Sequence, residues 1–99
     1  MKYKVSISEH AVANLEKIFE YLIQNWSDKV NDNFKKILQS KINSLTENPY
    51  MYPESGIKSG IRKCVITKHN TLYYRIITNE IEVITIHDNR QNPKSLKLD

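Results

Sequence analysis

The sequence predicts an α+β domain in which a hairpin of two helices covers one face of a mainly antiparallel four-stranded sheet. Three observations lead to this fold class. Polar and apolar residues alternate over residues 2–8, apolar residues recur at helical spacing along two stretches between residues 9 and 48, and three β-rich runs follow residue 60. The element order is therefore β-α-α-β-β-β, within a single domain of residues 1–99.

Residues 2–8 form the first predicted strand, with Tyr3, Val5 and Ile7 on its buried side. Ser8 and Glu9 then mark the start of a helix, because a serine hydroxyl caps free backbone N–H groups and an acid favours the positive helix end. Apolar residues recur from there at offsets of three and four, which predicts an amphipathic helix. The members of this stripe are Ala11, Leu15, Ile18, Phe19, Leu22 and Trp26.

Ser27 and Asp28 repeat the same start signal and predict a second helix. Asn48 and Pro49 end it, because a residue before proline is pushed out of the helical region. So short a turn between two amphipathic helices predicts an antiparallel hairpin. The apolar stripe of this second helix consists of Val30, Phe34, Ile37, Leu38, Ile42 and Leu45.

The second half of the chain is predicted to be a loop followed by three strands. Residues 49–60 hold two of the three prolines and both glycines, which is typical of a loop. The predicted strands, separated by turns of hairpin length, are residues 61–68, 72–77 and 81–87. Regular alternation along the last strand places four side chains on one face, namely Ile81, Val83, Thr85 and His87.

Composition limits the function classes. No apolar run is longer than three residues, which excludes a membrane span. The single cysteine, Cys64, cannot form an internal disulfide and fits a reducing, cytoplasmic compartment. Neither Cys64 nor any of the three histidines stands at a metal-ligand spacing from another, so we expect no metal and no cofactor.

Basic residues gather in one part of the chain. The 15 Lys and Arg residues outnumber the 11 acids, and residues 55–79 contain no acid at all. This window is either a solvated basic face or a nucleic-acid-binding surface, for which the candidates besides Arg62 are Lys58, Lys63, Lys68 and Arg75. His87 is the candidate acid or base for RNA cleavage in this half of the chain, apart from the turn residue His69, although a structural role at a strand end is the alternative.

Six segments, taken in their order and spacing, resemble the RelE/ParE superfamily of type II toxin–antitoxin toxins, which are often called plasmid stabilization proteins. The last two read Leu-Tyr-Tyr-Arg-Ile and Ile-His-Asp-Asn-Arg-Gln-Asn-Pro. The resemblance implies a growth-inhibiting toxin silenced by a small antitoxin whose C-terminal segment wraps over the hairpin and the sheet. Val12 and Ile23 lie outside the apolar stripes and are the candidate antitoxin contacts. The six segments are residues 3–11, 13–22, 45–49, 60–63, 72–76 and 86–93.

The resemblance implies two alternative modes of action. RelE-like members enter the ribosomal A site and cut mRNA with a cationic cluster on the sheet, whereas ParE-like members are not nucleases and block DNA gyrase. For a nuclease the resemblance assigns catalysis to Arg62, His87 and Arg90. Arg62 matches the superfamily's arginine at the start of the second strand, and Arg90 lies within about one position of its C-terminal catalytic arginine.

The sequence departs from the His-x-Arg-Arg-x-Pro ending that is common in ParE-like members, because Asn89 replaces the first arginine and one residue is inserted before the proline. It departs from the nuclease pattern in two places, since Lys58 is the only lysine in the loop before the second strand and no tyrosine follows Tyr74. The departures from the nuclease pattern favour a block of gyrase. Ribosome-dependent mRNA cleavage is the alternative, and a non-toxic nucleic-acid-binding relative is a further one.

Overall fold

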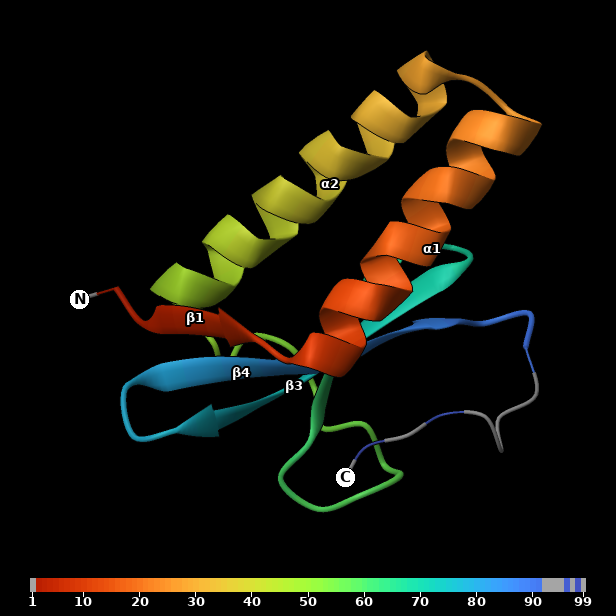
Figure 1. Ribbon diagram of the computed structural model, residues 1–99. Helices are drawn as coiled ribbons and strands as arrows, with labels where there is room; N and C mark the ends of the chain where they lie inside the picture. Colours follow the sequence, from red (N-terminus) through yellow and green to blue (C-terminus); the bar gives the residue numbers. More distant parts are fainter. Residues whose placement is uncertain (1, 92–95, 97, 99) are drawn as a thin grey trace.

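The computed structural model describes residues 2–91, 96 and 98 and has the predicted order of elements. The strands form one sheet in the order β1-β4-β3-β2, in which β1 runs parallel to β4 and the other neighbours are antiparallel. The hairpin of α1 and α2 covers one face of this sheet, as Figure 1 shows, so the predicted fold class is confirmed. The elements are β1 (Lys4–Ile7), α1 (Glu9–Asn25), α2 (Asp28–Glu47), β2 (Arg62–Thr67), β3 (Asn70–Ile77) and β4 (Glu80–Asp88).

The strand ends differ from the predicted ones by one or two residues, because ladder hydrogen bonds rather than side-chain pattern define them. No helix within the described part of the chain is long and apolar enough to cross a membrane. The Asn-Pro end of the last superfamily segment, residues 92–93, lies outside the described residues.

Serine caps begin both helices, as predicted. The Ser8 hydroxyl accepts a hydrogen bond from the backbone N–H of Ala11 at 3.0 Å, and it donates another to the carbonyl of Ile84 at 2.7 Å. Ser27 accepts from the N–H of Val30 at 3.1 Å. The Ser8 cap therefore does more than start α1, because it also ties that end of the helix to β4.

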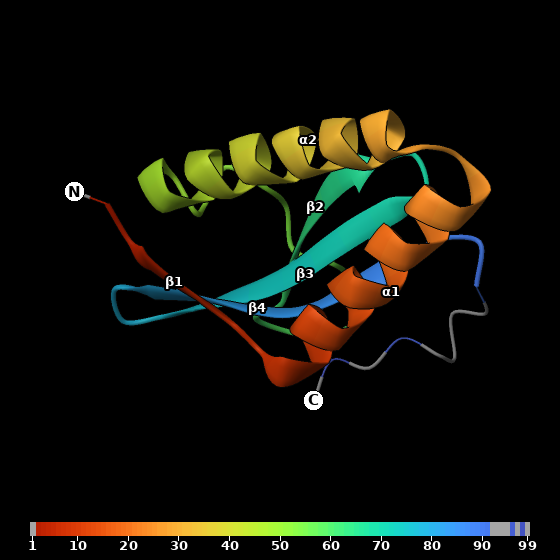
Figure 2. The ribbon, with the colours of Figure 1, turned by 45° about the horizontal axis from the view of Figure 1, so that its top comes forward.

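The main core lies between the hairpin and the sheet. Ala11 and Leu15 of α1 and Leu45 of α2 are buried there against Leu72 and Tyr74 of β3 and the first half of β4. A smaller apolar cluster lies on the opposite face, which we call the outer face, and consists of Ile61, Tyr73, Ile84, Leu96 and Leu98. Both faces of the sheet are thus buried in part, and Figure 2 shows the helices on one side only.

The prediction that side chains alternate regularly along β4 is wrong. Thr85 pairs with Tyr73 and Val83 with the next residue of β3, Tyr74, so Ile84 is an extra residue in a β-bulge. Val83 and Ile86 consequently both face the helices, although they are three positions apart and regular alternation would place them on opposite faces. His87 lies opposite Thr71, which points away from the helices, and it therefore lies on the outer face instead of the face predicted for it.

Replacing each capping serine separates the two roles of Ser8. We expect Ser8→Ala to lower the free energy of unfolding by about 2 kcal/mol and Ser27→Ala by about 1 kcal/mol, since only Ser8 also bonds to β4. Urea unfolding followed by far-ultraviolet circular dichroism measures both. Equal losses would contradict a stabilising role for the bond to Ile84.

Candidate functional site

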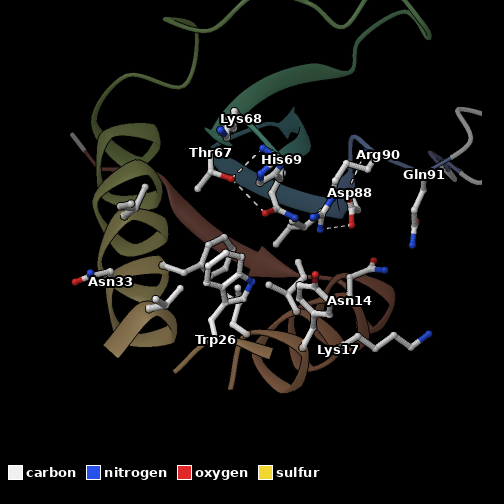
Figure 3. Close-up of a pocket in the computed structure, with 18 residues that line it drawn as sticks. Asn14, Lys17, Trp26, Asn33, Thr67, Lys68, His69, Asp88, Arg90 and Gln91 are labelled. Atoms are coloured by element: carbon white, nitrogen blue, oxygen red, sulfur yellow. Dashed lines mark hydrogen bonds and ion pairs between the residues drawn. The ribbon is translucent and has the colours of Figure 1, made fainter. Parts of the chain in front are cut away.

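A cavity of about 860 Å³ opens between the hairpin tip and one end of the sheet. Its first wall comes from the end of α1 and the first half of α2. The second wall comes from the β2–β3 turn and the end of β4. Figure 3 shows Trp26, Lys17 and Asn33 on the helical side, opposite Lys68, His69, Asp88 and Arg90. The aromatic and aliphatic residues of the helical wall include Tyr21, Leu22, Trp26, Val30, Phe34 and Ile37.

Several of these apolar side chains are exposed although the sequence predicts them in buried stripes. Trp26 is 68% exposed, and Val30 and Ile37 are 37% and 40% exposed. The prediction is wrong for these three because the connection between α1 and α2 rises away from the strands, as Figure 1 shows. Apolar surface at the tip thus faces the cavity instead of the sheet.

A charged contact crosses the cavity from β4 to α1. Arg90 donates from Nε to Asp88 Oδ1 at 3.0 Å and from Nη2 to Oδ2 at 2.9 Å. Its guanidinium carbon lies 5.6 Å from the centre of the Tyr21 ring, within the range of a cation–π interaction. We call Asp88, Arg90 and Tyr21 the clasp. Hydrogen bonds from Arg90 hold the pKa of Asp88 below its ordinary value, and the bond to Asp88 raises the pKa of Arg90.

Asn89 positions the clasp. Its backbone N–H donates to the His69 carbonyl at 2.7 Å, and its Oδ1 accepts from the Thr71 hydroxyl at 3.0 Å. These bonds fasten the chain after β4 to the β2–β3 turn, which leaves Arg90 pointing toward α1. Sequence reasoning treated Asn89 only as a departure from a motif. Its position between Asp88 and Arg90 gives no local signal of this role, because its partners His69 and Thr71 lie far away in the sequence, in the β2–β3 turn and at the start of β3.

The structure does not bring Arg62, His87 and Arg90 together. Arg62 lies at the start of β2 on the helix side of the sheet, where its Nη1 donates to the Tyr52 carbonyl at 2.6 Å. Arg62 lies opposite Tyr74 and Asp88 lies opposite Asn70, so four residues of β3, or roughly 13 Å, separate Arg62 from the strand end that Arg90 follows. His87 occupies the outer face. Three separate regions of the surface therefore hold the three candidates.

The candidate nucleic-acid contacts are also divided among different surfaces. Lys63 lies opposite Tyr73 on the outer face, and Arg75 on that face forms an ion pair with Glu82 at 2.7 Å. Lys68 lines the cavity, and Lys58 belongs to the loop before β2. Proximity in sequence does not translate into one basic face, because successive strand residues alternate between the two sides of the sheet.

Val12 and Ile23, the candidate antitoxin contacts, are exposed at 41% and 47% on α1. Neither lines the cavity. The residues that sequence reasoning did not single out as a binding surface are Tyr21, Trp26, Val30 and Ile37. The sequence did contain one signal of an exposed apolar surface. The two apolar stripes continue to the end of the hairpin, where the short sheet cannot cover them.

A metal or thiol site receives no support from the geometry of the described residues. Among residues 2–91, 96 and 98, no three His, Cys, Asp or Glu side chains gather as a metal-binding group. Cys64 is fully buried in β2, and burial raises the pKa of its thiol. A buried, protonated thiol is a poor nucleophile, so packing accounts for this residue.

Cys64 gives a direct test of the core on the helix side of the sheet. We expect Ellman's reagent to react with the folded chain at least about 100-fold more slowly than with the urea-unfolded chain, because burial denies access and disfavours the thiolate. The absorbance of the released thiolate measures both rates. Rapid labelling of the folded chain would contradict the packing around β2.

Within the clasp, the contact between Asp88 and Arg90 should make a pH-dependent contribution to the stability of the fold. The pKa of Asp88 is lowered by folding, so its contribution is present above the ordinary aspartate value of about 3.9 and is lost as the pH falls through the lower, folded value. At neutral pH we expect Asp88→Asn to destabilise the chain by at most about 1 kcal/mol, because the partner Arg90 is half exposed. Urea titrations of both proteins should converge at acidic pH, and a difference that grows on acidification would contradict the contact.

Comparisons with known proteins agree with this fold. The family model of the ParE toxin of the type II toxin–antitoxin system parDE matches residues 5–93. Toxin ParE1 of Caulobacter vibrioides is 27% identical over 90 residues, which covers 90% of this chain and 92% of that protein.

Two solved structures share the architecture at low sequence identity. The chromosomal ParDE system from P. aeruginosa aligns with a TM-score of 0.76 at 12% identity, covering 88% of this chain and 96% of that one. The toxin–antitoxin complex RelBE2 from Mycobacterium tuberculosis aligns with a TM-score of 0.62 at 13% identity, covering 90% and 100%. Because the family model spans nearly the whole chain, the protein belongs to the ParE toxin family of type II toxin–antitoxin systems.

Proposed function

We propose that this toxin inhibits growth by a ParE-like, non-enzymatic block of DNA gyrase and that a small antitoxin neutralises it. The observation that carries the choice of target is the separation of Arg62, His87 and Arg90. Cleavage of RNA requires a base, a cation and an acid around one phosphodiester. Arg62 and Arg90 instead bond to a backbone carbonyl and to Asp88, at opposite ends of the sheet.

The similarity to ParE proteins supports the same target, since both the matching family model and the Caulobacter vibrioides relative carry the ParE name. An antitoxin partner is supported by the solved relatives, which are a ParDE system and a RelBE2 toxin–antitoxin complex. The cytoplasm is the compartment that a gyrase target implies, and the lone buried Cys64 is compatible with it.

One observation favours the second candidate, ribosome-dependent mRNA cleavage. His87 and Lys63 share the outer face of the sheet, on strands that flank β3. An imidazole and an ammonium on one face supply an acid or base and a charge stabiliser. A nuclease built on this face would use His87 and Lys63, and it would not require Arg62 or Arg90.

Purified protein distinguishes the two targets. We expect it to inhibit supercoiling by bacterial gyrase and to leave mRNA intact in a translation extract, because Arg62, His87 and Arg90 lie apart from one another. His87→Ala should inhibit gyrase as well as the unaltered chain does. Position-specific mRNA cuts that disappear in His87→Ala would overturn the gyrase proposal.

Induced expression in a bacterial host tests toxicity itself. We expect growth to stop and to resume when a cognate antitoxin is produced as well. Normal growth with the protein soluble and folded would instead identify a non-toxic relative.

A further inference from the structure

The loop that joins α2 to β2, residues 48–61, exposes three large apolar side chains. Ile57 is 61% exposed, Tyr50 58% and Met51 54%. Of the large apolar residues in the described part of the chain, only Trp26 and Val65 are likewise more than half exposed. Apolar side chains that gather in one short segment, instead of lying singly over a surface, indicate a site of interaction with another molecule.

Hydrogen bonds hold the backbone of this loop in place. The backbone N–H of Ser55 donates to the Ile61 carbonyl at 2.7 Å, which pairs the loop with the chain that enters β2. On the other side, the hydroxyl of the buried Tyr74 donates to the Pro49 carbonyl at 2.6 Å. A loop fixed in this way loses little conformational freedom when a partner binds it.

Arg62 fixes the exposed aromatic ring at the start of the loop. Its Nη1 donates to the Tyr52 carbonyl at 2.6 Å, and its guanidinium carbon lies 5.2 Å from the centre of the Tyr50 ring. This distance permits a cation–π interaction, which restricts the ring without covering it. A tyrosine held in one orientation is well suited to contribute to binding at a protein interface.

Ile57 lies at the tip of the loop. Gly56 and Gly60 on either side of it have φ of +77° and +81°, a backbone conformation that favours glycine. Apart from chain neighbours, no described heavy atom lies within 4 Å of the position that a Cβ would take at either glycine. In Figure 1 this loop, drawn in green, extends below the strands. A protruding tip of this kind suits a concave surface on a partner.

The charge of this segment selects its partner. Residues 48–63 contain three basic residues and one acid, which leaves a net charge of +2. These residues are Lys58, Arg62, Lys63 and Glu54. The Oε1 atom of Glu54 already accepts a hydrogen bond from a backbone N–H of the loop at 3.3 Å. An acidic surface around an apolar cleft therefore complements the loop.

Other occupants fit this loop less well. A second copy of the chain would bring the same basic segment against itself. A nucleic acid complements the charge, but its phosphate backbone does not cover three apolar side chains. The antitoxin contacts expected from the sequence, Val12 and Ile23, lie on α1 and not on this loop. A protein target with an acidic and apolar surface satisfies both features of the loop.

We propose that the loop between α2 and β2 is the surface through which this toxin binds its protein target. Ile57 at the tip and Tyr50 and Met51 near the start of the loop form the apolar contact, and carboxylates of the target face the basic residues. The inference rests on the proposed function, which supplies gyrase as that target.

Two exposed isoleucines make a matched test. Ile57 lies at the tip of the loop, whereas Ile77, which is 47% exposed, lies at the end of β3. We expect Ile57→Ser to weaken binding to immobilised gyrase by about tenfold, because it removes an apolar interface side chain, and Ile77→Ser by less than about twofold. Biolayer interferometry measures the affinities, a supercoiling assay measures inhibition, and thermal unfolding checks that both variants are folded.

Tyr50 and salt provide two further readouts of the same contact. We expect Tyr50→Ala to weaken gyrase binding by about tenfold, because the ring fixed by Arg62 is lost. Added salt should weaken binding of the unaltered chain, because it screens the attraction between the basic loop and an acidic surface. An affinity for gyrase that either change leaves intact would overturn the proposed contact.

The outcomes separate this inference from the proposed function. Equal binding of gyrase by the unaltered chain and by Ile57→Ser would overturn the loop as the target contact and leave gyrase as the target. Loss of a cognate antitoxin together with gyrase in Ile57→Ser would also overturn it. Loss of DNA binding or of self-association, with gyrase binding kept, would reassign the loop to those partners. An unaltered chain that neither binds nor inhibits gyrase would contradict both proposals.

Discussion

The bulge at Ile84 is the constraint on which the rest of this structure depends. β4 is an inner strand, paired with β1 on one side and β3 on the other, and α1 packs against it. The extra residue reverses the alternation of every side chain that follows. Ile86 and Asp88 therefore turn toward the helices and His87 turns away. Without the bulge, Asp88 would lie on the outer face and Arg90 would have no partner beside Tyr21. One inserted residue thus creates the clasp and separates His87 from the cavity.

The Ser8 hydroxyl connects this bulge to the hairpin. It caps α1 and bonds the carbonyl of Ile84, so the start of α1 is fixed at the point where the β4 ladder is irregular. Asn89 fixes the other end of the same strand to the β2–β3 turn. Between these two attachments, α1 lies across β4 and its C-terminal turns extend past the strand end. The cavity is the consequence of a hairpin held firmly at its base and unsupported at its tip.

The elements could be predicted from the sequence, but the faces of β4 could not. Ser8, Ser27 and the Asn48-Pro49 pair act through neighbours a few residues away, so their signals are local and the helix bounds follow from them. Four of the six residues from Ile81 to Ile86 are apolar because both faces of the sheet are buried there, and alternation is a poor guide to the faces of such a run. Arg62, His87 and Arg90 lie apart because of the β3–β4 register and the order of the strands. Both are set by contacts between residues that are distant in sequence.

An exposed apolar tip is costly for a small domain and has to be explained by something other than folding. Tyr21, Trp26, Val30 and Ile37 contribute little to the core while they remain exposed. Extending the sheet beneath them would bury these side chains, but it would also remove the opening between the helices and Asp88. Any partner that covered them would bind only the folded chain and would therefore stabilise it by mass action. In the isolated chain the same side chains stay in water, so the stability of the fold rests on the base of the hairpin, where Ala11, Leu15 and Leu45 are buried.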